Sequence, residues 1–340
     1  MIDIHSHFFP RLDDDERAKL GEALPYLEIG EDDRGFIMLH GEPYRPVRRE
    51  LWDPEYRVAL LDENGIDVQL VCATPIMFGY DLPAQEKART ASYFNDRATQ
   101  FCADAGGRLL PLCQVPLPEL DASCAELERA KAMGHVGVQI GTHAGDFELD
   151  SEIMIAFLNH CARHEMGVLV HPWDMPTSPR GKPYMLPWLV GMPAETHLTI
   201  MRLILSGAFE RLDERLHICF SHGGGNFAAQ VGRADNAWRH RDIVRQDCPE
   251  LPSSYASRFY CDSIVFDHAT LSLLTGTMSV RRVMFGTDFP FPLGDQTPGE
   301  LVRKHPQLSP ADREAILRAN ATEFFGLEAH LKTKQLRNSA

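Results

Sequence analysis

Residues 167–172 read GVLVHP, a run of apolar residues that leads directly into a histidine. Runs of this kind, rich in Val, Ile, Leu and Cys and with little polar alternation, are typical of parallel strands buried on both faces. Seven further runs share these features: IDIH (2–5), VQLVCA (68–73), LLPLCQV (109–115), VGVQIG (136–141), HICFSH (217–222), FYCDSI (259–264) and RVMFGTD (282–288). The chain therefore contains eight predicted buried strands.

Segments of helical length and pattern separate these strands. The clearest span residues 53–65, 82–107, 120–134, 151–167 and 193–212, and several of them end at a glycine, a common helix stop signal. Eight strands that alternate with helices predict an α/β fold of the (β/α)8 TIM-barrel type, with a doubly wound sheet as the alternative.

Two segments do not fit the alternation. Residues 11–51 separate the first strand from the first long helix and are rich in turn residues, so we expect a small insertion beside the active-site mouth. Residues 328–340 are polar and predict a loosely ordered C-terminal tail. A barrel commonly occupies this length as one unit, so residues 1–327 are expected to form a single domain.

Composition narrows the class of protein. The 340 residues carry a formal net charge of −14, which disfavours nonspecific binding to nucleic acid or to an anionic membrane. The N-terminus lacks the apolar stretch of a signal peptide, and no run approaches the ~20 apolar residues of a membrane span, so we expect a cytoplasmic protein. The eight cysteines form no C-x-x-C pair and are expected to be reduced thiols.

Histidines and an aspartate lie where a barrel carries its active site. His5 and His7 are two positions apart on a predicted strand, so both side chains point to one face. His171, His222 and Asp288 end the fifth, sixth and eighth predicted strands, and the carboxyl ends of barrel strands form the active site. Imidazoles directed at one point are well suited to a divalent ion. The pattern predicts a metal centre.

The chain resembles the amidohydrolase superfamily and, more narrowly, the 2-amino-3-carboxymuconate-6-semialdehyde decarboxylase family. The resemblance extends from Ile2 to about Leu327. The segments that carry it are IDIHSHFFP, YRPV, LWDPEYR, VQLVCATPIMFGY, HPWDM, MLPWLVGMPAET, HGGGNFAAQVGR and FGTDFPFPLG. One departure is Phe289, where we expect a tyrosine in relatives. The glycines at 223–225 lack the G-K-[ST] of a phosphate loop and favour a tight turn instead.

The resemblance implies a role for each site residue. It implies one Zn²⁺ per subunit, with Mn²⁺ or another divalent ion as an alternative. The implied metal ligands are His5, His7, His171 and Asp288, the implied catalytic groups are His222 and Asp288, and the implied substrate-binding residues are Arg45, Arg233, Phe291 and Met175. Arg233 would enter the site of a neighbouring subunit, which implies a homodimer. The fourth predicted strand ends without the Lys or Glu that bridges two metals in related enzymes, which favours a single ion.

The activity implied is nonoxidative decarboxylation of 2-amino-3-carboxymuconate-6-semialdehyde to 2-aminomuconate-6-semialdehyde, with release of CO2, in tryptophan and kynurenine catabolism. Three alternatives remain open. They are a decarboxylase of hydroxybenzoate-type aromatic acids that uses manganese, a mononuclear metal-dependent hydrolase of the same superfamily, and a noncatalytic barrel that binds a ligand or partner. The first two keep the metal site, and the third does not need it.

Overall fold

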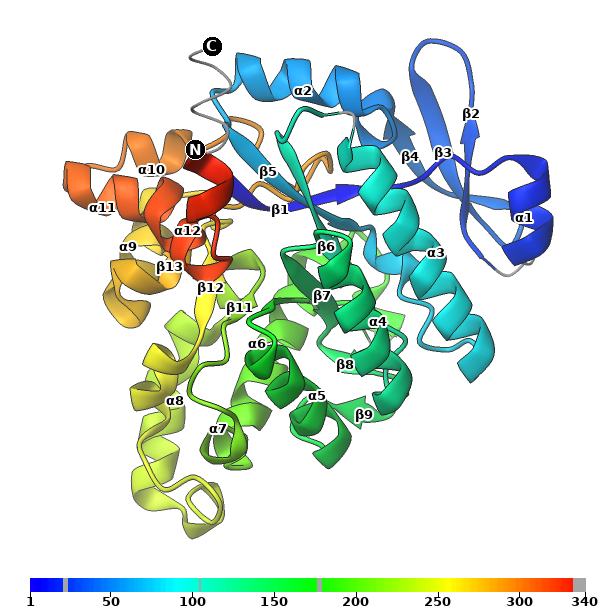
Figure 1. The fold of residues 1–340 in the computed structure, drawn as a ribbon. Coiled ribbons are helices and arrows are strands. Elements are labelled where there is room, and N and C mark those ends of the chain that lie inside the picture. The colour runs from blue at the N-terminus through cyan, green and yellow to red at the C-terminus, as the bar shows by residue number, and fades with distance from the viewer. Residues whose placement is uncertain (21–23, 104, 176–178, 333–340) are drawn as a thin grey trace.

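The computed structural model describes residues 1–20, 24–103, 105–175 and 179–332, and its centre is an eight-stranded sheet (Figure 1). The strands follow one another around the sheet in chain order, and every hydrogen-bonded neighbour is parallel. They are β1 (Ile2–Phe8), β5 (Val68–Ala73), β6 (Leu109–Cys113), β7 (Gly137–Gly141), β10 (Gly167–His171), β11 (Ile218–Phe220), β12 (Tyr260–Asp262) and β13 (Val283–Met284). All eight coincide with the predicted runs.

Backbone hydrogen bonds between the first strand and the segment at the end of the last one close the sheet. The Ile4 amide donates to the Phe285 carbonyl at 3.0 Å, and the His7 amide donates to the Phe289 carbonyl at 2.7 Å. A sheet whose first and last strands are joined has no free edge. The prediction of a TIM barrel is confirmed, and the doubly wound alternative is excluded.

Helices surround the barrel (Figure 1). The longer ones are α2 (Pro54–Glu63), α3 (Ala84–Ala103), α4 (Leu120–Ala132), α5 (Glu152–Arg163), α6 (Met192–Leu205), α8 (Phe227–His240) and α9 (His268–Met278). The shorter ones are α7 (Ala208–Arg211), α10 (Glu300–Arg303), α11 (Pro310–Glu314) and α12 (Asn320–Phe324). None of the described helices has the length and hydropathy needed to cross a membrane.

One predicted helix is broken in the structure. Residues 193–212 were expected to form a single helix, but α6 ends at Leu205 and α7 begins at Ala208. Gly207 has a φ of 67°, and a Cβ at this position would lie 2.3 Å from the carbonyl oxygen of Asp247. Only glycine combines that backbone conformation with so close an approach, so the chain turns here.

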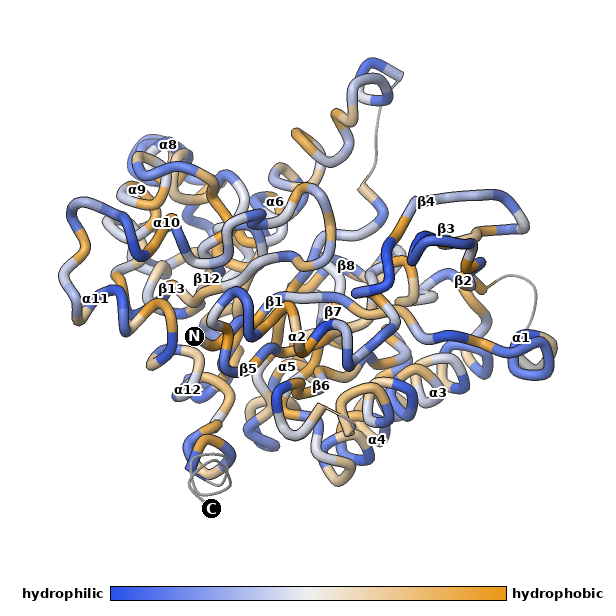
Figure 2. Tube along the Cα trace, turned by 90° about the horizontal axis from the view of Figure 1, so that it is seen from above, coloured by the Kyte–Doolittle hydropathy of each residue, from blue (hydrophilic) through white to orange (hydrophobic). Residues whose placement is uncertain are grey.

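The segment expected as an insertion contains helix α1 (Asp14–Leu20) and a separate antiparallel sheet. Its strands are β2 (Tyr26–Ile29), β3 (Arg34–Leu39) and β4 (Glu42–Arg48), in the order β2–β3–β4. Figures 1 and 2 show α1 and this sheet projecting to one side of the barrel. A second small hairpin, β8 (His143–Ala144) and β9 (Phe147–Glu148), follows β7. That residues 1–327 form one domain stays a prediction.

The core lies inside the barrel and between its strands and helices. Every residue of β1 is buried, including its histidines. In Figure 2 hydrophobic segments gather along the central strands, whereas hydrophilic ones lie on the peripheral turns and helices. All eight cysteines are free thiols, and seven of them are buried.

The beginning of the C-terminal tail differs from the prediction. Residues 328–332 are helical, and the ring of His330 hydrogen-bonds to the carbonyl of Gly107 at 2.9 Å. Leu331 packs against buried residues at this end of the barrel. Polar composition alone had suggested loose order, but these two contacts tie the segment down. Residues 333–340 lie outside the described part of the chain.

Candidate active site

Three imidazoles and one carboxylate converge at the carboxyl ends of the barrel strands. One ligand atom from each of His5, His7, His171 and Asp288 lies within 4.8 Å of the others, and all four residues are buried. His7 Nε2 is 3.2 Å from His5 Nε2 and 3.1 Å from Asp288 Oδ1. These distances between donor atoms leave room for one metal ion at their centre.

The fold explains this convergence. His5 and His7 lie on the same face of β1, and His171 is the last residue of β10. Asp288 follows β13 with a φ of 59°, and its amide donates to the His5 carbonyl at 2.8 Å. The left-handed backbone, uncommon for a residue other than glycine, turns the carboxylate back toward the histidines of β1.

The second nitrogen of each imidazole is held by an oxygen acceptor. His5 Nδ1–H donates to Asp262 Oδ2 at 2.8 Å. The corresponding partners are the Ala73 carbonyl for His7, at 3.1 Å, and the Pro172 carbonyl for His171, at 2.9 Å. Because Nδ1 carries the proton in each ring, the Nε2 lone pairs point toward the common centre, as in metal-bound histidines.

The residues fit a divalent ion. His171 Nε2 is buried and has no hydrogen-bond partner among the described residues, a costly state for a polar atom in the interior. The lone pairs of His5 Nε2 and His7 Nε2 face each other with no donor assigned between them. A cation at the centre would satisfy all three nitrogens, and a set of three imidazoles and a carboxylate suits zinc or manganese.

The ionisation states support the same conclusion. Burial, together with the nearby imidazoles of His222 and His5, lowers the pKa of His171 well below its ordinary value. Burial also lowers the pKa of His7. For Asp288, burial alone would raise the pKa, but the neighbouring imidazoles of His222, His7 and His5 hold it well below the usual range. The pKa of His5 is raised, because the carboxylates of Asp262 and Asp288 outweigh its burial. The neutral imidazoles of His7 and His171 beside an ionised carboxylate are the forms that bind a metal.

Asp262, at the end of β12, was not predicted as a site residue. Besides accepting from His5, its Oδ2 accepts from the His222 amide at 2.9 Å, and its Oδ1 accepts from the Gly223 amide at 2.8 Å. This carboxylate is fully buried and connects a candidate metal ligand to the turn that carries His222. A charged residue that ends a buried strand, as in FYCD, is the sequence signal that could have identified it.

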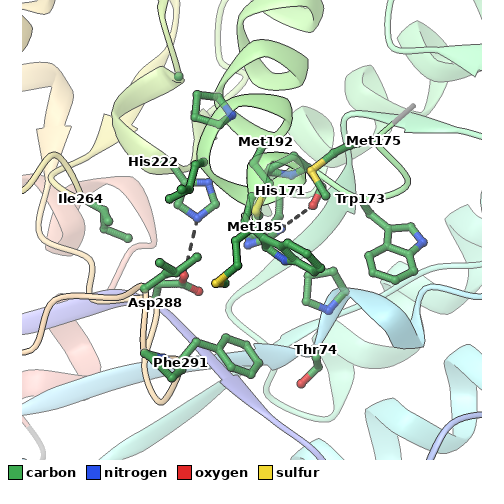
Figure 3. A pocket seen from close by; sticks show the side chains of 18 of the residues that line it. Thr74, His171, Trp173, Met175, Met185, Met192, His222, Ile264, Asp288 and Phe291 are labelled. Carbon is green, nitrogen blue, oxygen red and sulfur yellow. Dashed lines mark hydrogen bonds and ion pairs between the residues drawn. The ribbon is translucent and has the colours of Figure 1, made fainter. Parts of the chain in front are cut away.

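His222 lies at the start of a short 3-10 turn (His222–Gly224) after β11. Its φ is 54°, and its Nε2 is 3.7 Å from Asp288 Oδ2. Figure 3 shows the two side chains pointing toward each other at the pocket. The turn is tight: a Cβ at Gly225 would lie 2.2 Å from the Pro193 carbonyl oxygen. His222 is therefore beside the cluster but is not part of the set of four.

A cavity of about 710 Å³ opens over the cluster and reaches His171, His222 and Asp288. Arg45 from β4 lines it, with its guanidinium 4.6 Å from the ring centroid of Phe291. The nearby ion pairs with Asp33 and Asp53 are made by Arg49, and Arg45 takes part in no ion pair in the described part of the chain. The remaining wall is largely apolar and includes Met175, Trp173, Met185, Trp188 and Met192, several of which Figure 3 labels.

Arg233 is not brought to this cavity. It lies in α8, where its side chain is exposed, and it does not line the pocket. Of the predicted substrate-binding residues, Arg45, Phe291 and Met175 line the pocket of this chain. Within one subunit, Arg233 lies outside it.

Two further charged residues are buried beside β1. Asp3 accepts hydrogen bonds from Thr287 Oγ1 at 2.6 Å and Gln69 Nε2 at 2.7 Å, and burial raises its pKa to about 6. Arg57 of α2 donates to the His7 carbonyl, and its guanidinium lies 5.0 Å from the Phe289 ring centroid. Burial lowers the pKa of Arg57 to about 10, so it remains a cation at neutral pH. Phe289 thus makes an aromatic contact here that needs no hydroxyl.

Comparisons with known proteins agree with this fold. The chain is 34% identical to 2-amino-3-carboxymuconate-6-semialdehyde decarboxylase of Dictyostelium discoideum over 96% of its own length and 92% of that protein. Its fold is similar to that of apo IDCase from Metarhizium anisopliae (TM-score 0.83, 21% identity, 97% of each chain). A dihydroxybenzoic acid decarboxylase from a Polaromonas species, with bound manganese and 2-nitroresorcinol, has a TM-score of 0.74, 21% identity and 96% coverage of each chain.

A match to the family model described as amidohydrolase covers residues 2–327, almost the whole chain. The model and the 34% identical relative both span the strands that carry the histidines and the aspartate. The chain therefore belongs to the amidohydrolase superfamily and, within it, to the family of the 2-amino-3-carboxymuconate-6-semialdehyde decarboxylases.

Proposed function

We propose that this protein is a metal-dependent carboxy-lyase that converts 2-amino-3-carboxymuconate-6-semialdehyde to 2-aminomuconate-6-semialdehyde and CO2. One observation carries the proposal: three imidazole nitrogens and one carboxylate converge below a largely apolar cavity that contains the unpaired cation of Arg45. His5, His7, His171 and Asp288 would hold one Zn²⁺. When bound, a divalent ion supplies Lewis acidity and a fixed positive charge beside the substrate.

The protein's own residues perform the remaining tasks. The Arg45 guanidinium binds a substrate carboxylate through paired hydrogen bonds, because its planar fork matches the two oxygens. Its contact with the Phe291 ring fixes the guanidinium at the cavity wall. Loss of CO2 leaves an electron pair on carbon, which the conjugated aldehyde of the proposed substrate can accept. His222 Nε2 faces the cavity and can give or accept the proton that the reaction needs.

The decisive experiment offers freshly generated 2-amino-3-carboxymuconate-6-semialdehyde to the purified, zinc-loaded protein and measures CO2 release. We expect turnover with this substrate and little with 2,6-dihydroxybenzoate. The reverse preference, above all with manganese, would favour the second candidate, an aromatic-acid decarboxylase, which the similarity to the manganese-containing Polaromonas enzyme supports. Hydrolysis of amide or lactone substrates, with no CO2 release from the semialdehyde or from 2,6-dihydroxybenzoate, would overturn both decarboxylase proposals.

The role proposed for His222 can be separated from metal binding. Replacing His222 with Gln keeps a polar side chain but removes the group that transfers the proton, so activity should fall by about 100-fold or more. The variant should still contain close to one ion per chain by elemental analysis. Loss of the metal would instead make His222 a ligand.

We also propose that the enzyme is a homodimer in which Arg233 completes the neighbouring subunit's substrate site. The proposal is supported by the exposure of Arg233, by its position outside the pocket of its own chain and by the apolar residues nearby on α8. Mixing inactive Arg233→Ala and His222→Ala subunits should give mixed dimers with one intact site each. At random assortment about a quarter of the wild-type activity should return. No recovery after verified subunit exchange would contradict the shared site. The cytoplasmic location stays a prediction.

A further inference from the structure

A second group of metal-binding side chains meets on the outside of the barrel. His160 and His164 lie at the end of α5, and Glu128 lies on the neighbouring α4. His160 Nε2 is 3.1 Å from Glu128 Oε1, and His164 Nε2 is 3.6 Å from the same oxygen. One ligand atom from each residue lies within 4.8 Å of the others.

The spacing of the two histidines suits coordination. Residues four apart on a helix face the same side, and two histidines with this spacing are a recurrent zinc-binding arrangement. Their ring centroids are 4.3 Å apart. His160 Nε2 is a buried atom with no hydrogen bond of good geometry, although the Glu128 oxygen is within ion-pair distance. His160 Nε2 is thus directed toward the Glu128 carboxylate, at the point where an ion would lie.

The local charges both favour and oppose a cation. The carbonyl end of α5 carries partial negative charge, and the Glu128 carboxylate adds a full one. Burial and the neighbouring His164 lower the pKa of His160, which keeps its imidazole neutral. Against this, Arg163 donates to His160 Nδ1 at 3.3 Å, and Lys131 donates to the His164 carbonyl. Arg163 is exposed and would have to turn toward solvent when Nε2 binds an ion.

This group is remote from catalysis because of its place in the fold. His164 ends α5 just before β10 begins at Gly167, whereas His171 lies at the other end of the same strand. The three residues therefore belong to the N-terminal face of the barrel, which contributes to stability rather than chemistry in this fold. An ion at this position would link helix α4 to helix α5.

We propose that Glu128, His160 and His164 form a second, exchangeable site for a divalent transition metal, Zn²⁺ being the expected ion. With two nitrogens and one oxygen from the protein, the remaining coordination positions are open to water. Because the ion binds only the folded arrangement, it should stabilise the protein in proportion to its occupancy. The site is independent of the proposed decarboxylase activity.

The test uses tag-free protein already loaded with one zinc ion at the catalytic site. Titration with Zn²⁺ should show one further ion per chain, and its binding should raise the melting temperature. His164→Ala should weaken this second event by more than about 10-fold and abolish the thermal shift. His240→Ala, which removes an exposed histidine of α8, serves as the matched control and should bind like the wild type.

Arg163→Ala provides a test in the opposite direction. It removes the donor that competes at His160 and one positive charge, so the second ion should bind more tightly. Absence of a second ion in the wild type, or equal affinity in the wild type and His164→Ala, would overturn the proposal. Because neither variant touches the catalytic pocket, unchanged catalytic zinc content verifies that each is correctly folded.

Discussion

The two proposed metal-binding clusters both combine histidines with one carboxylate, but they differ in how these side chains are supported. At the barrel mouth, strands and strand ends supply the proposed ligands, and an oxygen acceptor orients each imidazole. On the α4–α5 face, two helices supply the ligands, and His160 Nδ1 faces a donor, Arg163, instead of an acceptor. Orientation by outer hydrogen bonds, more than ligand identity, should therefore decide which cluster retains its ion during purification.

The largest effect is expected from His171→Ala. This change removes one of four ligands from the buried cluster, so the catalytic ion should be lost and kcat/KM should fall by more than ~100-fold, beyond the range of outer contacts. Elemental analysis after gel filtration measures the metal, and CO2 release measures the activity. The weaker site on α4 and α5 should still bind Zn²⁺ in this variant. Full activity with no bound metal would show that the buried cluster needs no ion, and it would contradict the contrast drawn between the two clusters.

Asp262→Asn should have an intermediate effect. The wild-type carboxylate accepts hydrogen bonds from the His5 ring and from the backbone amides of His222 and Gly223. The side-chain NH2 of asparagine would instead present a donor to at least one of these three donors. We expect a loss of about 10- to 100-fold in metal affinity or activity, as for other outer-shell changes. Titration of the metal-free protein measures the metal affinity, and kcat at saturating metal measures the activity.

Asp267→Asn is the matched control for that change. Asp267 is the exposed N-cap of α9, and asparagine is an equally good N-cap, so metal affinity and stability should be unchanged. If Asp262→Asn behaves like this control, the buried carboxylate has no part in orienting the site.

The smallest effect is expected from Glu128→Gln. The substitution removes a charge from the exposed side of the second site and leaves both of its histidines. Affinity for the second Zn²⁺ should fall about fivefold, the scale of one exposed charge interaction of ~1 kcal/mol. The decarboxylation rate should not change. A drop in activity would link the two faces of the barrel and contradict their separation.

The barrel could be predicted from the sequence because each of its strands is buried on both faces. The run GVLV (167–170) and the centre ICF (218–220) of HICFSH therefore contain no polar position that would obscure a short strand. The same regularity predicted that His5, His7, His171 and Asp288 would meet, since strand ends in a barrel converge. Which of them bind an ion stays a prediction until metal is measured.

Other features had no local signal. The strands β2, β3 and β4 are short, and their exposed positions mix charged with apolar residues, so their pattern resembled turns. Arg57 occupies an ordinary helical position, and only the packed structure reveals that it is fully buried. Whether Arg233 faces a substrate depends on a second subunit, which no pattern within one chain encodes.

The buried charges beside β1 have a consequence for the choice of ion. Asp3, Asp262 and Asp288 place three carboxylates in the interior, and among the described residues Arg57 is the one guanidinium buried with them. In the proposed metal-bound state, in which all three imidazoles are neutral, two negative charges remain in excess. Excess charge in a protein interior is strongly unfavourable, so this region approaches electroneutrality only when a divalent cation is bound. A monovalent ion would leave one negative charge unbalanced and a trivalent ion one positive charge. We therefore expect valence, as well as ligand type, to favour zinc, manganese and other divalent ions at the proposed site.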